Sequence, residues 1–545
     1  MAGNIFTVVF HCFFHVLFNE GFKMRKRFVT AWVFAIAVST MYGGCACAGA
    51  MTVDQDTSVI TQENDPYFIE GTERLKQELA TPPITNQAKN IILFVADGNG
   101  VSTVFATRVF EGQQRGRTGE ENALSYEKFP CLGLAKTYNT NYQVPDSAGT
   151  STALHAGVKT KKGVIGVNSD ILVKDFESAE GKDVTSVLEL AEMAGMSTGV
   201  ISTARVTHAT PAAAYAHSAS RNWEDDKDFL KDKKSGGKDI ARQLIEFPLG
   251  NGLEVALGGG RRSFIPATMD DPEYAPKKGE RQDGRNLALE WTEKFPNAAY
   301  VWNEEQFKNV DPVKTDHLLG LFQPSHMQYE TDRVKDKAGE PSLAEMTEKS
   351  IEILSKNPNG YYLMVESGRI DHANHDTNAY RAVTDGVAFA KAVETALKMT
   401  DPEDTLILVT ADHSHTLTVS GYPGRGNNIL GLVYSMTEDG TKLKDTPQLG
   451  LDGKPYTTIS YANGPGGFSG ERPDLTNVDT TDRDFIQQAM IPMKSETHSG
   501  EDVAVYARGP WAHLIRGTFE QSYVYHVMDY AGQLRNRAAQ GKTTR

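Results

Sequence analysis

Carboxylates and imidazoles recur at the ends of apolar stretches of this chain. Glu366, Asp371 and His375 lie within the ten residues ESGRIDHANH. Asp371 and His375 are four residues apart, so one helical turn would bring both side chains to the same metal ion. For this segment taken alone, the alternative is an ordinary surface ion pair.

Two further segments supply the same kinds of ligand. TADHSH places Asp412 and His413 side by side after one apolar run, and THSGED places His498 just before another. Asp97 ends the apolar run NIILFVA. Carboxylates and imidazoles without thiolates suit borderline divalent metals such as zinc. Because two adjacent metals form the usual arrangement for in-line phosphoryl displacement, these segments indicate metal-dependent phosphoryl transfer.

Ser147 is the candidate nucleophile. It lies in VPDSAGTSTA, where Asp146 or Ser147 is suited to cap the start of a helix. A helix cap with no further role is the alternative for this stretch. The positive end of a helix and a nearby metal would both favour the alkoxide of Ser147, and its small neighbours would leave room for a phosphate.

The elements that position these residues alternate along the chain. Apolar runs within 90–97, 197–206, 252–260, 360–367, 404–411 and 501–508 each lead into a polar or glycine-rich loop, and 378–399 has helical spacing. This alternation predicts an α/β fold with a doubly wound, mostly parallel sheet and helices on both faces. Asp97, Glu366 and Asp412 would then meet beyond the carboxyl ends of the strands, where they repel one another unless cations bind.

The chain is predicted to divide into five segments. Residues 1–50 form a leader with Met24 as the expected true start, and 51–89 form an N-terminal arm and linker. The core domain occupies 90–416 and 491–545, and a Gly/Pro/Asn-rich insert occupies 417–490.

The leader predicts a periplasmic or secreted protein. Residues 25–27 are basic, an apolar run follows, and small residues end the segment, which is the pattern of a secretory signal peptide. A membrane anchor is the alternative, but each apolar run is short for a membrane span. Lipid attachment at Cys45 is a weaker alternative.

The charge balance excludes some partners. The net charge is −14 for 545 residues, and without residues 1–50 it becomes 52 − 69 = −17. Such a surface repels nucleic acid and anionic membranes, so no nucleic-acid binding surface is expected. An anionic substrate would need positive groups concentrated at its site.

Together these motifs carry a family resemblance. QVPDSAGTSTA, GVKT, VESGRIDH, TADHSH and ETHSGEDVAV resemble alkaline phosphatase, and the likeness runs from about Glu63 to the end. KTYNTNYQVPDSAGTSTA, HATPAAAYAHSASRNW and GLFQPSHMQYE are closer to the animal tissue enzymes than to the shorter enterobacterial type. The resemblance implies a phosphate monoester hydrolase of broad specificity, which releases inorganic phosphate through a covalent phosphoserine intermediate at Ser147.

The resemblance also implies roles for further residues. One zinc would be held by Asp371, His375 and His498, and a second by Asp97, Asp412 and His413. A magnesium would be held by Asp97, Thr210 and Glu366, with His208 near it through water and His372 in the surroundings of the metals, where the enterobacterial type has lysine. Arg221 would clamp two phosphate oxygens, for which a planar guanidinium is better suited than lysine.

A calcium site is a further implication of the resemblance. Its ligands would be Glu273, the carbonyl of Phe322, Gln323 and Glu340. Gln323 replaces a carboxylate, and this change should weaken calcium binding.

The resemblance implies a homodimer as well. The arm would reach a second subunit, and the 417–490 insert would form a crown near the dimer axis.

Two rival functions remain: a phosphodiesterase or sulfatase of the same superfamily, and a non-catalytic metal- or phosphate-binding protein. Arg221 and the magnesium residues favour a monoester, the nucleophile position holds no cysteine, and a binding module would gain nothing from Ser147.

Overall fold

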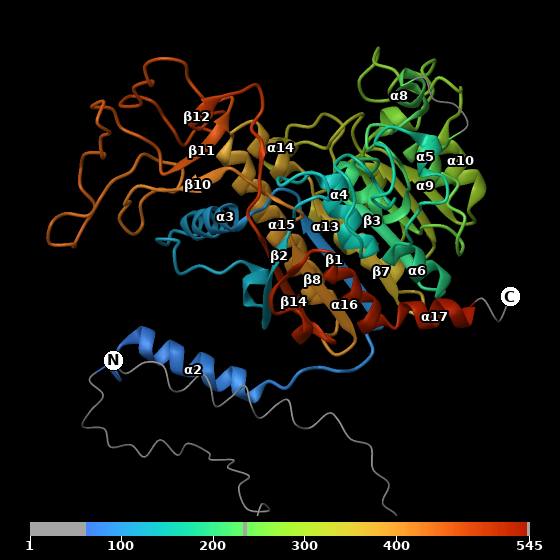
Figure 1. Ribbon diagram of the computed structural model, residues 1–545, viewed down its shortest axis with the longest axis horizontal. Coiled ribbons are helices and arrows are strands. Elements are labelled where there is room, and N and C mark those ends of the chain that lie inside the picture. Colours follow the sequence, from blue (N-terminus) through green and yellow to red (C-terminus); the bar gives the residue numbers. More distant parts are fainter. Residues whose placement is uncertain (1–61, 233–236, 542–545) are drawn as a thin grey trace, which may run out of the picture. The chain divides into compact units, whose positions relative to one another are not determined.

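A computed structural model describes residues 62–232 and 237–541 (Figure 1). The predicted leader, 1–50, lies outside the described residues. The described residues divide into two compact units, one that ends at Ala80 and one that begins at Thr81. In the first unit, α2 (Pro66–Ala80) begins after Asp65, whose side chain accepts the backbone N–H of Tyr67 at 2.8 Å, and none of its residues is buried.

The second unit is built on a ten-stranded sheet among the described residues. β14 runs antiparallel to both neighbours, and the other pairings in this sheet are parallel. The strands in spatial order are β15 (Gly517–Glu520), β2 (Cys131–Lys136), β14 (Val503–Arg508), β8 (Thr405–Thr410), β1 (Asn90–Ala96), β7 (Tyr361–Ser367), β3 (Ser197–Arg205), β4 (Val255–Gly259), β6 (His317–Leu321) and β5 (Ala298–Val301). All six predicted strand runs are strands of this sheet.

Helices cover both faces of the sheet, as strand β1 shows. Its residues Ile91, Leu93 and Val95 belong to one hydrophobic cluster, with α6 (Val187–Met193), α7 (Ala209–Tyr215) and α16 (Tyr523–Gly532). Ile92 and Phe94 belong to another, with α13 (Leu343–Leu354) and α15 (Ala379–Met399). Because successive side chains of a strand point to opposite faces, both faces are buried, and the predicted doubly wound α/β fold is confirmed.

The remaining helices are mostly short. They are α3 (Val101–Gln114), α4 (Ser147–Ala156), α5 (Phe176–Ala179), α8 (Asp226–Lys231), α9 (Ile240–Ile245), α10 (Leu287–Lys294), α11 (Glu304–Lys308), α12 (Glu330–Arg333), α14 (Arg369–His375) and α17 (Leu534–Gly541). Single 3-10 turns occupy Ser125–Lys128, Arg261–Ser263 and Ala512–Leu514. Across the part of the chain that the structure describes, no helix is both long and apolar enough to span a bilayer.

Two small sheets lie outside the main one. In the 417–490 region, β10 (Leu417–Val419) pairs antiparallel with β11 (Ile459–Gly464), which pairs parallel with β12 (Ala489–Pro492). Long loops connect these strands and extend away from α5 and α8 (Figure 1). β9 (Ser414–His415) pairs with β13 (His498–Ser499), which brings two of the histidine-bearing segments together.

Candidate active site

Three neighbouring strands bring the predicted carboxylates to one edge of the sheet. Val95 of β1 is in register with Glu366 of β7 and with Thr410 of β8. Asp97 and Asp412 follow the last residues of β1 and β8, and both are completely buried. The expected convergence at the carboxyl ends of parallel strands is therefore observed.

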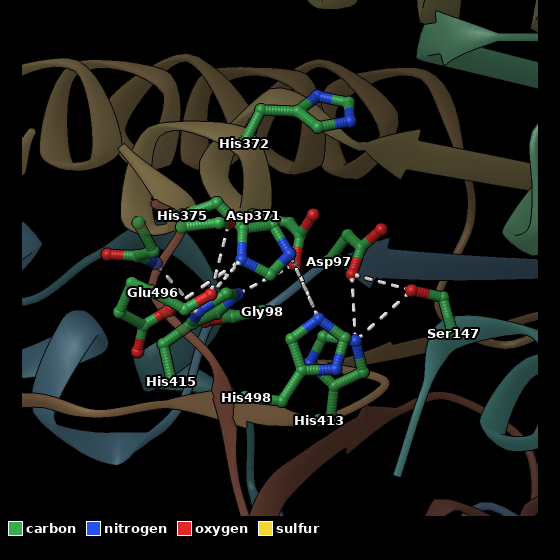
Figure 2. Close-up of polar contacts among 12 residues, drawn as sticks. Asp97, Gly98, Ser147, Asp371, His372, His375, His413, His415, Glu496 and His498 are labelled. Atoms are coloured by element: carbon green, nitrogen blue, oxygen red, sulfur yellow. Dashed lines mark hydrogen bonds and ion pairs between the residues drawn. The ribbon is translucent and has the colours of Figure 1, made fainter. Parts of the chain in front are cut away.

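Asp371, His375 and His498 belong, together with His415, to the first group of possible metal ligands. The His375 Nε2 atom lies 3.4 Å from Asp371 Oδ1 and 3.1 Å from His498 Nε2 (Figure 2). The Nδ1 atoms of His375 and His498 lie 2.6 Å and 2.8 Å from the carbonyl oxygens of Glu496 and Pro145. When each Nδ1–H donates to its carbonyl, both Nε2 atoms are left with a lone pair for a metal.

Asp97, Asp412 and His413 form the second group. His413 Nε2 lies 3.4 Å from Asp97 Oδ1 and 3.2 Å from Asp412 Oδ2, and the three side chains are fully buried. Thr150 of α4 donates to Asp412 Oδ2 at 3.2 Å, and the Gly98 backbone N–H donates to Asp412 Oδ1 at 3.1 Å. These bonds fix the orientation of the Asp412 carboxylate.

Asp97, His208 and Glu366 form the third group. Thr210, on the first turn of α7, places its buried hydroxyl beside Glu366. Each of these four side chains has a buried polar atom without a hydrogen-bond partner: Asp97 Oδ2, His208 Nδ1, Thr210 Oγ1 and Glu366 Oε1. Unsatisfied buried oxygens are costly, so this donor set fits a bound oxygen-preferring cation.

The nucleophile candidate faces the second group. Ser147 is the first residue of α4, and its Oγ lies 3.1 Å from His413 Nε2 and 3.4 Å from Asp97 Oδ1 (Figure 2). Asp146 is the helix cap, because its side chain accepts the N–H of Gly149. A Cβ at Gly149 would lie 2.5 Å from the Asn139 amide oxygen, so the small residue is sterically required there.

Arg221 is held beside the serine by Asp146. Its guanidinium lies 3.1 Å from Asp146 Oδ2 and 3.0 Å from His208 Nε2. Burial alone would raise the pKa of Asp146, but Arg221 holds it below the usual value. Asp146 thus orients both the serine helix and the cationic side chain, and of these two roles only the helix cap was predicted from the sequence.

The carboxylates of the second and third groups repel one another. Burial, with contributions from the charges of Asp371 and Asp412, raises the pKa of Asp97 well above its usual value. Burial also raises the pKa of Glu366 to about 8, despite a hydrogen bond from Ser202. Divalent cations would remove this repulsion, which is a second physical reason that these groups fit metals.

In the first group, imidazoles lower the pKa of the carboxylate instead of raising it. This group includes His415, which was not predicted from the sequence. His415 Nε2 lies 2.7 Å from Asp371 Oδ1, and His415 Nδ1 lies 2.5 Å from Glu496 Oε2. Although burial opposes it, Glu496 and Asp371 raise the pKa of His415 to about 10. Burial would raise the pKa of Asp371, yet the imidazoles of His375, His415 and His498 hold it well below its usual value. His415 therefore orients Asp371 from behind.

The other predicted residues lie in two different places. The His372 ring packs 4.0 Å from the His326 ring and 5.6 Å from His208, away from the Asp371 carboxylate (Figure 2). Three of the predicted calcium residues form a separate cluster around Asp336, because Gln323 Nε2 donates to Asp336 Oδ1 at 2.7 Å and the carboxylates of Glu273 and Glu340 experience its charge. Glu273 is also paired with the guanidinium of Arg261 at 3.2 Å.

Comparison with known proteins places the chain in one family. The family model for alkaline phosphatase matches residues 88–534. Alkaline phosphatase from Gadus morhua is 46% identical over 482 residues, covering 86% of this chain and 98% of the relative. The tissue-nonspecific isozyme of Homo sapiens is 44% identical over 482 residues, covering 86% and 89%.

A solved structure supports the fold. The crystal structure of Thermus thermophilus alkaline phosphatase superimposes with a TM-score of 0.59 at 24% identity, covering 85% of this chain and 97% of that chain. The curated animal relatives are the nearer of these matches in sequence, as the motifs had indicated. The chain therefore belongs to the alkaline phosphatase family.

Proposed function

We propose that the chain hydrolyses phosphate monoesters of many kinds through a phosphoserine intermediate at Ser147, with two zinc ions and one magnesium ion bound. The observation that carries this proposal is the position of Ser147 Oγ, 3.1 Å from His413 and 3.4 Å from Asp97 at a helix start. Asp97 belongs to two of the three ligand groups, so two cations would share its carboxylate. The Ser147 hydroxyl lies next to this shared ligand.

The residues present fit these ions. One zinc would be held by Asp371, His375 and His498, the second by Asp97, Asp412 and His413, and magnesium by Asp97, Thr210 and Glu366 with His208 close by. When bound, such cations favour the ionised form of a nearby hydroxyl and neutralise charge on phosphoryl oxygens. We infer that His372 binds no metal itself and influences the metal ligands indirectly, through its contacts with His208 and Arg369.

The chain's own groups account for binding and orientation. The guanidinium of Arg221 would bind phosphoryl oxygens, and Asp146 and His208 hold it in place. The bond from Ser147 Oγ to phosphorus forms as the bond from phosphorus to the leaving alcohol oxygen breaks. Water then attacks phosphorus and Ser147 leaves, which returns the free serine and inorganic phosphate. Because recognition centres on the phosphoryl group, we expect the leaving alcohol to contribute little to specificity.

Metal analysis tests the cofactor assignment. We expect the purified protein to contain about two zinc and one magnesium per chain, from the number and type of ligands. Elemental analysis by mass spectrometry after gel filtration measures these ratios. Full hydrolysis of p-nitrophenyl phosphate by exhaustively chelated protein would contradict the proposal.

Calcium binding is a separate prediction. Asp336 would supply the carboxylate that is missing at Gln323. Glu273 and Glu340 both experience the charge of Asp336, and the oxygens Asp336 Oδ2 and Glu340 Oε2 are buried without a hydrogen-bond partner. Asp336 thus restores a carboxylate to the cluster, so calcium should raise the Tm by a few degrees. The Tm of Asp336→Asn should not respond, whereas Asp311→Asn, at an exposed carboxylate, should respond as the parent does. An unchanged Tm of the parent protein would contradict the site.

We also propose that the protein is exported and forms a homodimer. The leader pattern of 1–50 supports export. Exposed apolar side chains on α2, including Tyr67 and Leu79, and near β12, including Met490 and Ile491, support association with a second copy.

A further inference from the structure

A cavity lies away from the three ligand groups, and none of their residues lines it. Its volume is about 490 Å³, and residues of α5, α8, the end of α7 and the loop after it line its walls. Small-molecule sites in proteins are commonly about 300 to 1,000 Å³. The cavity is therefore large enough for a compact organic ligand.

Aromatic rings form the inner wall of this cavity. Phe229 packs edge-to-face against Trp223 at 4.9 Å and against Phe176 at 6.0 Å between ring centroids. Tyr215 and Phe247 also line it, and both are almost completely buried. Aromatic walls favour apolar groups and also attract cations through the negative charge above their faces.

The carboxylates at the cavity differ in their pairing. Glu189 is paired with His217 at 3.0 Å, and Glu246 with Lys238 at 2.9 Å. Glu180 and Asp183 are exposed at the rim, and among residues 62–232 and 237–541 no cationic group lies within ion-pair distance of either. The rim therefore carries two exposed carboxylates above an aromatic interior, and one of them, Asp183, also experiences the charge of His217 on the cavity wall.

We propose that this cavity binds organic ammonium ions with an apolar body. The apolar body would fill the space against Phe176, Trp223 and Phe229, and the ammonium group would lie near Asp183. Anionic phosphate esters would be repelled by the same rim, so the cavity is not a second substrate site.

The cavity is connected to the proposed phosphate clamp through the chain. The wall segment 215–223 contains Arg221, whose backbone N–H donates to the Gly163 carbonyl at 2.8 Å. Ser218 of the same wall forms a β-bridge with Ile165. A ligand in the cavity would thus contact the segment that carries Arg221 without occupying the phosphate position.

Titration of the metal-loaded protein with benzyltrimethylammonium tests the proposal. We expect saturable one-to-one binding by calorimetry and a tryptophan fluorescence change that Trp223→Phe removes. Ala179→Leu, which fills the cavity, should weaken binding at least about tenfold because a close-packed wall leaves no space for the ligand. Asp183→Asn should weaken it about threefold, the scale of an exposed ion pair.

Matched controls separate binding in the cavity from binding elsewhere on the acidic surface. Glu177→Gln removes an exposed carboxylate of α5 that does not line the cavity, and it should bind the probe as the parent does. Binding should persist in saturating inorganic phosphate, and benzenesulfonate should not bind. No saturable binding, equal binding by Ala179→Leu, or displacement of the probe by phosphate would overturn the proposal.

Discussion

Replacing Ser147 by alanine is expected to lower kcat for p-nitrophenyl phosphate at least about a thousandfold, the scale seen when a nucleophile is removed from a working site. The hydroxyl is the one alcohol among the described residues that faces both His413 Nε2 and Asp97 Oδ1. Its loss removes the attacking oxygen and leaves the three ligand groups intact. Steady-state kinetics with metal analysis of the same sample measures both effects.

Ser151→Ala is the matched control for this variant. Ser151 is the other buried serine of α4, and its hydroxyl donates to the Thr210 carbonyl at 2.8 Å. Its loss removes this bond and a contact with His155 Nδ1 at 3.2 Å. A buried hydrogen bond is worth about 1 kcal/mol, so the loss should lower activity less than about tenfold. Equal rates in Ser147→Ala and the parent would remove the covalent mechanism.

Asp97→Asn should have the second largest effect, because it alters two ligand groups at once. Asp97 is shared by the group with Asp412 and His413 and by the group with His208 and Glu366. Losing an outer partner of a metal ligand typically costs about 10- to 100-fold in metal affinity, so losing a shared ligand should cost at least that. We expect about one metal per chain after dialysis instead of three, with activity falling in proportion to occupancy or further.

Asp385→Asn controls for the loss of a buried carboxylate. Burial raises the pKa of Asp385 to about 8, so the native side chain is largely neutral at pH 7 and an amide is a close substitute. Asp385 lies outside the three ligand groups. This variant should keep its metals and its activity. Retention of all three metals by Asp97→Asn would contradict the shared-ligand assignment.

The core of the fold could be predicted because its central strands are buried on both faces. Runs such as NIILFVA and TLILVT are continuous apolar segments. The polar residues that follow them mark the edge of the sheet where the candidate site lies. The outer strands β2 and β5 were not predicted. β2 alternates exposed and buried residues and contains a glycine, and β5 has only one fully buried residue. Tertiary pairing, more than local sequence, makes these segments strands.

The ligand types could be predicted from spacing and resemblance, but the residues that orient them could not. TADHSH contains two histidines, of which the resemblance singled out His413 as a ligand. That His415 lies behind Asp371, on a strand paired with β13, is seen only in the folded chain. Asp146 was recognised as a possible helix cap. Its bond to Arg221, 75 residues away, depends on the folded chain. Asp336 accepts a hydrogen bond from Gln323 and lies in a loop that carries no motif.

Peptide mapping of the rapidly quenched enzyme tests the central claim most directly. Metal-loaded protein mixed with a phosphate monoester should carry one phosphoryl group on Ser147. The label should disappear after chelation and return when zinc and magnesium are restored. Phosphorylation at a different residue, or equal labelling of Ser147 in the chelated protein, would contradict the account.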